Sequence, residues 1–518
     1  MAPLALVRRR VSGTRLPVTP VASAALLAAI LAVSLVLRLR GVGSALWIDE
    51  GLSVGISSFP FADIPAMLRL DGSPPLYYLL LHLWMGMFGT SEAATHTLSL
   101  VFALAAVPVG LWAGWSLFGP RVGWFAAALF ALNPFLTEYS HEARMYSLIV
   151  VLALVATAAF VHAFVLDRRR YAIAFAAALA TMLYTHNWSL FFLAAAGVAW
   201  LFVVRRRPDR RRTVLLDGAL AFGGAVLVWL PWVPTLLFQA RHTGAPWAIA
   251  PTLDNLRGGV SSVLGGLGPA IGLLLVAGTG LSHILRRRRD VERLELLTIA
   301  VLGIGTLLIA FGASQISPAW AYRYLAVVVG PLVLIAGIGL ARAGRLGVAA
   351  LALVALMWLP QGASPDPPTA EKNVVADLAP LLDRGDLVVS THPERMTVLD
   401  YYLPRGLTYA TALGRVTDPR LMDWRDVMPR LEEARPWESM EATIDKLPPG
   451  NDLLLVRPVT ENEQNWSAPW TSLVRRRSSQ WSRQLRHDPR FVRRAVSPER
   501  PSGATSGVRA TLYTKIRG

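Results

Sequence analysis

The stretch PVASAALLAAILAVSLVLRLRGVGSALWIDEGLS, residues 20–53, joins an apolar run to a pair of adjacent carboxylates, Asp49 and Glu50. A bilayer core about 30 Å thick needs roughly 20 helical residues to cross it, so the run predicts a membrane helix. No convincing small-x-small cleavage site precedes the acid pair, which favours a retained helix over a signal peptide. The pair is then either part of a solvated loop or a catalytic base at the membrane surface.

The composition predicts an α-helical polytopic membrane protein. Of the 518 residues, 53% are hydrophobic, and the mean hydropathy of +0.43 is too high for an ordinary soluble protein. We expect about 11 transmembrane helices. They lie near residues 19–40, 93–117, 122–137, 145–166, 171–185, 188–204, 213–238, 259–285, 293–313, 322–341 and 345–360. Residues 76–88 are short for a span and are expected along the interface or dipping into the membrane.

The net charge of +17 reflects how the chain is oriented in the membrane and does not indicate a nucleic-acid partner. Much of it lies in arginine runs between apolar segments, at residues 7–10, 167–170, 205–212 and 286–289. The positive-inside rule assigns such loops to the cytoplasm. The remaining ionisable residues then collect outside, in the first outer loop (residues 41–92) and in short loops near residues 138–146, 185–188, 239–247 and 314–324. A shared face makes an active site there plausible.

Residues 362–518 differ in composition from the transmembrane part, residues 1–361, and predict a small α/β domain outside the membrane. Strands are expected at 387–390, 451–458 and 509–516, and a helix leading to Tyr401 and Tyr402. The arginine-rich segment 475–494 is expected to form a solvated helix face and an edge strand. Contact with anionic lipid headgroups or glycan is the alternative.

Candidate site residues stand where expected outer loops meet spans. In FLTEYSHEARMYSLIV, residues 135–150, Ser140 is a suitable helix N-cap with Glu142 in the first turn. Arg144 and Tyr146 follow at membrane depth, where ionisable groups usually mark a pathway or a site. Such a helix start is a natural anion site, although a surface cap with a Glu–Arg pair is equally compatible.

Two further outer positions suit phosphate chemistry and proton transfer. Arg323, between tyrosines in AYRYLAVVVGP (residues 321–331), either snorkels to the interface or grips a lipid-linked phosphate. Asp49, supported by Glu50, could take the proton of an acceptor hydroxyl. His82 and His96 sit on apolar segments and are expected to be packed.

No metal or cofactor motif is recognisable in the sequence. A divalent cation remains an open option, with these candidate side chains: His141, His186, Asp71, Glu138 and Glu142. The chain has no cysteine, which excludes disulfides, a thiol nucleophile and Cys-ligated metal. P-loop, G-x-G-x-x-G, G-x-S-x-G and H-E-x-x-H motifs are absent as well. An outward-facing enzyme has no nucleotide supply, so its activated donor is expected to be a polyprenyl phosphate.

An ordered set of motifs resembles the glycosyltransferase family 39 type of GT-C membrane glycosyltransferases, which include protein O-mannosyltransferases and aminoarabinose transferases. The set is LWIDEGLS, DGSPPLYYLLLHLWMGMFGTSE, NPFLTEYSHEARMYSLIVVLAL and LYTHNW, with weaker support from residues 322–331. The resemblance covers roughly residues 30–200 well. It implies a GT-C fold, an extracytoplasmic site and inverting transfer from a polyprenyl-phosphate sugar.

The resemblance also implies roles for individual residues. Asp49 would be the general base with Glu50 beside it. The family's E-A-R-x-Y element maps onto Glu142, Arg144 and Tyr146, and its R-Y element onto Arg323 and Tyr324, which are expected near the donor phosphate. His141 and His186 are the other expected donor-binding residues, from their place in the outer loops. Aminoarabinose transferases carry Glu-Lys before the paired prolines, where this chain has Gly72 and Ser73. Their lysine–phosphate contact therefore cannot carry over, so Arg144 or Arg323 would supply the charge, and a lipid A substrate is disfavoured.

The leading hypothesis is a bacterial plasma-membrane enzyme that transfers a sugar to an envelope glycan, glycolipid or secreted protein. Mannose is the first choice of sugar, and an arabinosyl or aminoarabinosyl transferase of the same fold is the alternative. A membrane transporter or flippase is a second hypothesis, which inverted repeats and charged residues at mid-membrane would favour. A third is a degenerate family member acting as a binding or scaffold subunit.

Overall fold

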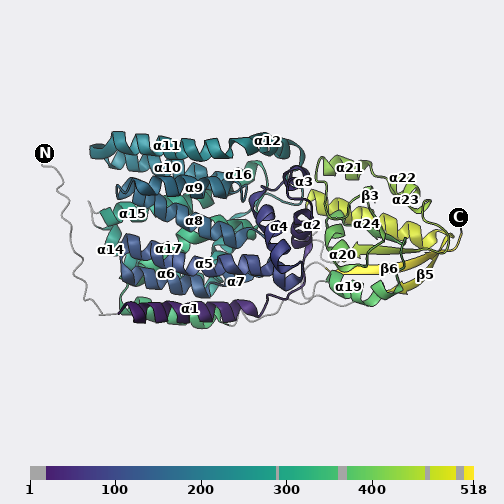
Figure 1. Cartoon of the computed structure of the whole chain (residues 1–518), viewed down its shortest axis with the longest axis horizontal. Helices are drawn as coiled ribbons and strands as arrows, with labels where there is room; N and C mark the ends of the chain where they lie inside the picture. The colour runs from purple at the N-terminus through teal and green to yellow at the C-terminus, as the bar shows by residue number, and fades with distance from the viewer. Residues whose placement is uncertain (1–18, 287–290, 360–369, 461–466, 498–506, 518) are drawn as a thin grey trace.

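The computed structural model describes residues 19–286, 291–359, 370–460, 467–497 and 507–517. It consists of a bundle of long helices with an α/β domain seated on one end (Figure 1). The arginine run at 7–10, residues 287–289 of another run and the expected boundary between residues 361 and 362 lie outside the described residues. That boundary stays a prediction.

The helices of the bundle follow the expected spans. They are α1 (Pro20–Leu39), α5 (Glu92–Phe118), α6 (Pro120–Leu132), α8 (Tyr146–Phe160), α9 (Arg170–Leu183), α10 (Ser189–Arg206), α11 (Arg211–Trp229), α14 (Leu267–Leu285), α15 (Val291–Ala300), α16 (Thr306–Ile316), α17 (Ala326–Arg342) and α18 (Arg345–Trp358). Eight helical segments of the described chain are long and apolar enough to cross a membrane. The protein is therefore a multi-pass membrane protein, and the count of 11 stays a prediction.

Three expected spans have different bounds in the structure. The run 122–137 is divided between α6 and α7 (Pro134–Glu138), and the run 213–238 between α11 and α12 (Val233–His242). Residues 259–285 are divided between α13 (Leu253–Val263) and α14, with a break at Gly265 and Gly266. Both glycines have positive φ, +72° and +108°. Left-handed backbone cannot continue an α-helix, so the chain turns there and α14 starts again as a separate element.

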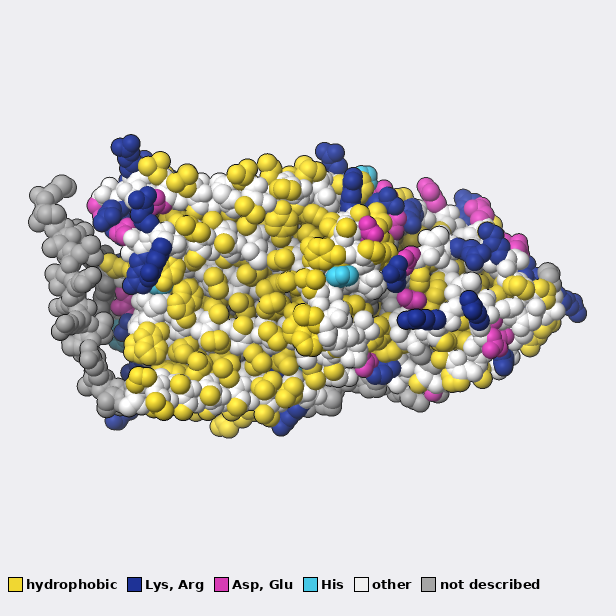
Figure 2. Space-filling model, in the orientation of Figure 1, with side chains coloured by type: hydrophobic (Ala, Val, Ile, Leu, Met, Phe, Trp, Pro, Cys, Tyr) yellow, Lys and Arg dark blue, Asp and Glu magenta, His cyan; other side chains and the backbone are white. Residues whose placement is uncertain are grey.

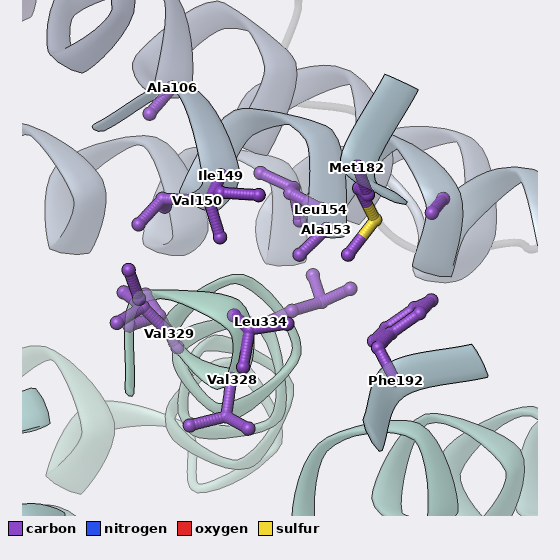
Figure 3. Close-up of a cluster of buried hydrophobic side chains, with 14 of the residues drawn as sticks. Ala106, Ile149, Val150, Ala153, Leu154, Met182, Phe192, Val328, Val329 and Leu334 are labelled. Atoms are coloured by element: carbon purple, nitrogen blue, oxygen red, sulfur yellow. The ribbon is translucent and has the colours of Figure 1, made fainter. Parts of the chain in front are cut away.

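The core of the bundle lies where α8 and α17 pack together. Ile149, Val150 and Leu154 of α8 face Val329 and its neighbours on α17 (Figure 3). A Cβ on Gly330 would lie 2.9 Å from the backbone nitrogen of Leu154, so the glycine permits this close approach. Both helices are buried over most of their length, whereas α1 shows most of its apolar surface at the periphery.

The arginine turns and the loops expected outside lie at opposite ends of the bundle, as the positive-inside rule predicts. The turns at residues 167–170 and 205–211 lie at the end distant from the α/β domain, because α8 and α10 run away from that domain. The loops expected outside lie at the near end. Figure 2 shows a hydrophobic belt on the visible face of the bundle, with Lys and Arg gathered beyond both of its edges.

Short elements form a layer between the bundle and the α/β domain. They are α2 (Ile48–Ser57), α3 (Ile64–Asp71), α4 (Leu76–Phe88), α7 (Pro134–Glu138), α12 (Val233–His242) and α13. The expected helix start at Ser140 is wrong, because the chain turns through residues 139–145 and α8 begins at Tyr146. The Ser140 hydroxyl donates to the Thr137 carbonyl at 2.7 Å, so it closes α7 instead of capping α8.

The α/β domain has a six-stranded sheet of order β3-β2-β1-β4-β6-β5. β1 is parallel to β2 and β4, and the other pairings are antiparallel. The strands are β1 (Leu387–Ser390), β2 (Thr408–Thr411), β3 (Gly414–Val416), β4 (Asp452–Pro458), β5 (Phe491–Val496) and β6 (Val508–Lys515). The helices are α19 (Ala370–Leu378), α20 (Met396–Tyr402), α21 (Val427–Glu433), α22 (Pro436–Ser439), α23 (Glu441–Ile444) and α24 (Pro469–His487).

The arginine-rich segment forms α24 and the edge strand β5. Trp481 and Leu485 of α24 are buried in the domain core, and arginines such as Arg476 and Arg483 point to solvent. This is the arrangement expected for a solvated helix face. The segment therefore helps to build the domain.

Helix α2 connects the bundle to the α/β domain through two glycines. A Cβ on Gly51 would lie 2.8 Å from the backbone nitrogen of Val398, and one on Gly55 would lie 2.3 Å from the carbonyl oxygen of Arg420. On the same side, Leu52 packs with Trp424 and other apolar side chains of the domain. The domain thus lies directly against α2, which carries the acid pair.

We predict that Gly55→Ala weakens the docking of the α/β domain. The added methyl group meets backbone, which cannot rotate away, so we expect a loss of about 1–3 kcal/mol from overpacking. Thermal unfolding of the detergent-purified protein measures this. Gly86→Ala is the control, since Gly86 is also helical but a Cβ there meets nothing within 4 Å. Equal melting temperatures for the two variants would contradict the close contact.

Candidate active site

A cavity of about 600 Å³ lies between the near end of the bundle and the α/β domain. Asp49, Arg144, His186, Arg323 and Tyr324 all line it. These residues come from segments up to 275 positions apart, Asp49 to Tyr324, and the fold brings them together. Glu50, His141, Glu142 and Tyr146, which the sequence also predicts, are not among the lining residues.

Asp49 stands in the first turn of α2 and presents its carboxylate to the cavity. Its Oδ2 lies 3.4 Å from Nη2 of Arg323, and its side chain is 16% exposed. The Asp49 carbonyl accepts hydrogen bonds from the Ser53 hydroxyl at 3.0 Å and from Nη1 of Arg144 at 3.3 Å. At 3.4 Å, the contact between the Asp49 carboxylate and the Arg323 guanidinium is long for an ion pair. A third group from the cavity can therefore bind between these two side chains.

Glu50 points the other way, into the protein, and is 2% exposed. Its Oε1 accepts from the Ala143 amide and contacts Nε2 of His96, both at 2.6 Å, while Oε2 accepts from the Trp47 amide at 3.2 Å. Nδ1 of His96 contacts the Val42 carbonyl at 2.9 Å, so this histidine is packed, as expected. Glu50 thus joins the start of α2 to α5 and to the loop before α8.

Arg144 forms the floor beneath the start of α2. Its Nη1 donates to the hydroxyl of Tyr78 at 3.0 Å and to that of Ser53 at 3.1 Å, in addition to the Asp49 carbonyl. The guanidinium therefore holds α2 against α4 while still reaching the cavity. Buried cations need such partners, because an unpaired charge in the interior costs several kcal/mol.

Arg323 is held in an aromatic enclosure. Its guanidinium carbon lies 5.4 Å from the ring centroid of Trp47 and 5.3 Å from those of Trp247 and Tyr324. Cation–π contacts of this kind orient the planar fork without using its N–H donors. The donors of Arg323 can thus serve Asp49 and an anionic ligand in the cavity.

His186 is a neutral imidazole on the cavity wall. Burial, with Arg144 and Arg323 nearby, lowers the pKa of His186 to about 3. Its Nδ1 accepts the Trp188 amide hydrogen at 3.1 Å, so the ring proton resides on Nε2. The ring centroid lies 4.8 Å from that of Tyr324. His186 can therefore donate one hydrogen bond and stays uncharged at neutral pH.

Three predicted site residues support the cavity from outside it. Tyr146 is buried behind His186 and Tyr324, with ring centroids 6.0 and 6.4 Å away. His141 contacts the Arg38 carbonyl at the end of α1 at 2.5 Å. Burial raises the pKa of Glu142 well above its ordinary value, and the Glu50 and Glu138 carboxylates raise it further.

Asp71 also lines the cavity, at the end of α3, where Gly72 (φ +107°) ends the helix. Burial raises the pKa of Asp71, while a hydrogen bond with Ser73 and the charge of Arg144 oppose the shift. Within the described ranges, no three His, Asp or Glu side chains converge as a metal site would require. The five side chains named as metal candidates therefore do not form one cluster there.

The α/β domain contributes a wall of the cavity that was not predicted from the sequence. His392, Glu394, Trp424 and Thr471 line the cavity opposite the bundle. A signal was present, since THPER follows directly after the expected strand at 387–390. Ligands of α/β sheets bind at the carboxyl ends of strands, which would have marked this segment.

Comparison with solved structures supports the fold. ArnT from Cupriavidus metallidurans bound to undecaprenyl phosphate is similar with a TM-score of 0.63 and 13% identity, covering 96% of this chain and 99% of that one. The mycobacterial arabinofuranosyltransferase AftD gives a TM-score of 0.56 and 16% identity, over 95% of this chain and 42% of that one. The chain has the GT-C fold.

A third solved structure with a similar fold is an archaeal oligosaccharyltransferase. The Archaeoglobus fulgidus oligosaccharyltransferase tethered to an acceptor peptide gives a TM-score of 0.53 at 10% identity, over 89% of this chain and 72% of that one. No family model and no curated protein sequence matches the chain. At these identities the shared property is the GT-C architecture, a membrane helical bundle that carries an extramembrane domain.

We predict that Glu142→Gln stabilises the protein increasingly as pH rises above about 4.5. Because the pKa of Glu142 is raised in the folded state, the unfolded chain loses this proton first, and wild-type stability falls as pH rises toward the folded pKa. Removing the carboxyl abolishes that loss, at up to about 1.4 kcal/mol per pH unit. Chemical unfolding from pH 4 to pH 8 measures the difference. A constant difference across this range would contradict a raised pKa.

Proposed function

We propose that the protein is an inverting glycosyltransferase that moves a sugar from a polyprenyl-phosphate donor to a hydroxyl group. The observation that carries the proposal is the shared cavity of Asp49 and Arg323, which places a base beside a phosphate-binding cation. The neighbours ArnT and AftD, which share the fold, supply the class of reaction by analogy. Mannose is the first donor sugar to test and arabinose the second.

The proposed step uses one carboxylate. Asp49 accepts the proton of the acceptor hydroxyl as its oxygen attacks the anomeric carbon. The bond from that carbon to the phosphate oxygen breaks, and polyprenyl phosphate leaves with the bonding electrons. A single displacement inverts the anomeric centre, so no second carboxylate has to act as a nucleophile.

Arg323 and His186 receive the negative charge that develops on the leaving phosphate. The guanidinium fork of Arg323 offers two parallel N–H donors, and the neutral His186 offers a third from Nε2. Phosphate binding competes with Asp49 for Arg323, which frees the carboxylate to accept the hydroxyl proton. Arg144 and Glu50 position α2, and hence Asp49.

The protein is proposed to lie in a bacterial plasma membrane with the cavity and the α/β domain outside. The basic turns at residues 167–170 and 205–211, at the opposite end, support this orientation through the positive-inside rule. Acceptors would be envelope glycans, glycolipids or secreted proteins. The cavity lies at one end of the bundle, which disfavours the transporter hypothesis, because that hypothesis requires a site near mid-membrane.

We predict that Asp49→Asn lowers sugar transfer by at least about 100-fold while the protein stays folded and inserted. Release of polyprenyl phosphate from labelled polyprenyl-phosphate mannose and arabinose measures the reaction. Asp254→Asn is the control, because that carboxylate is 89% exposed on α13. Near-normal release by the Asp49 variant would refute its role as the base.

Arg323→Gln is expected to weaken binding of undecaprenyl phosphate by at least about tenfold, the loss typical of a charged hydrogen bond. Titration of the lipid against protein in nanodiscs gives the Kd. Arg257→Gln removes the same charge at a site that is 82% exposed and should leave the Kd unchanged. If both variants bind alike, the phosphate lies elsewhere.

A further inference from the structure

The wall of the cavity opposite the bundle is built at the carboxyl end of β1. The chain leaves this strand at Ser390 and turns through Pro393–Arg395, a 3-10 turn that precedes α20. His392 and Glu394 of this turn line the same cavity as Asp49. The side chains of both are mostly enclosed, at 8% and 13% exposed.

A chain of contacts fixes the orientation of these two side chains. Nε of Arg395 donates to Nδ1 of His392 at 3.0 Å, so the imidazole proton lies on Nε2, 3.3 Å from Oε1 of Glu394. The same carboxylate oxygen accepts from the indole N–H of Trp470. Arg395 is itself buried and paired with Glu371. The Glu394 carboxylate is therefore preorganised, with both of these contacts made by its Oε1 atom.

An aromatic surface adjoins the carboxylate. Trp424 lines the cavity and lies against Trp470, with ring centroids 5.4 Å apart. Thr471, at the start of α24, lines the cavity beside them. A carboxylate next to an indole face is suited to a sugar ring, because hydroxyl groups donate to the carboxylate and the C–H face of the ring packs on the aromatic.

The same wall is poorly suited to an extended peptide. Strand β1 pairs with β2 on one side and with β4 on the other. The cavity therefore meets the end of an interior strand, where a peptide finds no free strand edge to pair with. The charge of the wall also restricts the acceptor, because the carboxylates of Glu394, Asp49 and Asp71 would repel a phosphate group on it.

We propose that His392, Glu394 and Trp424 form the acceptor subsite and that it takes an uncharged sugar. The inference rests on the proposed function and deepens it by naming the acceptor class. In this arrangement the donor phosphate binds on the Arg323 side of the cavity. The acceptor sugar lies against the α/β domain, with one hydroxyl directed at Asp49.

Saturation-transfer NMR on the purified full-length protein tests the subsite, with the Arg323 side of the cavity first saturated with undecaprenyl phosphate so that a phosphorylated probe cannot bind there. The probes are methyl α-D-mannopyranoside, methyl α-D-arabinofuranoside, glucosamine 1-phosphate and a Ser/Thr-containing hexapeptide. We expect signal for at least one methyl glycoside and none for the phosphorylated sugar or the peptide. Glu394→Gln should lower the glycoside signal at least fivefold, and Gln keeps an oxygen to accept from Trp470. Glu433→Gln, an exposed change on the same domain, should leave it unchanged.

Binding of undecaprenyl phosphate in the same samples separates the two proposals. The subsite is supported if Glu394→Gln loses the glycoside and binds the lipid as the wild type does. It is overturned if the variant keeps the glycoside, if it loses the lipid as well, or if the wild type prefers the peptide or the phosphorylated sugar. Failure of the wild type to bind undecaprenyl phosphate would instead overturn the proposed function, whatever the glycosides do.

Discussion

The buried carboxylate of Glu50 is the contact on which the arrangement of the cavity depends. It accepts the amides of Trp47 and Ala143 and contacts His96, so it fixes the start of α2 to two other parts of the bundle. Adjacent residues on an α-helix point about 100° apart, and with Glu50 directed inward Asp49 is directed to the cavity. The Glu50 carboxylate thus holds α2 in place, and the Asp49 carboxylate faces the cavity.

The second constraint is the close contact of α2 with the α/β domain. Gly51 and Gly55 let the backbone of the domain approach, and Leu52 fills the space between them. Helix α2 is thus held from both sides. The cavity beside it has one wall that carries arginines and an opposite wall that carries a carboxylate, an imidazole and an indole. Transfer of a sugar requires both a donor and an acceptor site, and the two-domain construction supplies a separate wall for each.

Much of this could be predicted from the sequence, because apolar runs and basic loops follow directly from the physics of the bilayer. The same reasoning placed Asp49, Arg144, His186 and Arg323 on one face, and the structure brings them to one cavity. Local capping rules failed at Ser140, whose hydroxyl serves the preceding helix. The segment with His392 and Glu394 could have been marked by its place after a strand, but its position opposite Asp49 depends on how the two domains pack, which no local pattern encodes. The inward direction of Glu50 depends on His96 and Ala143, which are distant in sequence.

The most direct test of the account is a donor-panel assay that reads both turnover and stereochemistry. Purified protein is incubated with polyprenyl-phosphate mannose and polyprenyl-phosphate arabinose together with a neutral glycoside acceptor, and the product is analysed by NMR. We expect one donor to release polyprenyl phosphate in proportion to the acceptor, and the transferred sugar to have the inverted anomeric configuration. Retention of configuration, or no turnover of either donor by protein that binds undecaprenyl phosphate, would contradict this expectation.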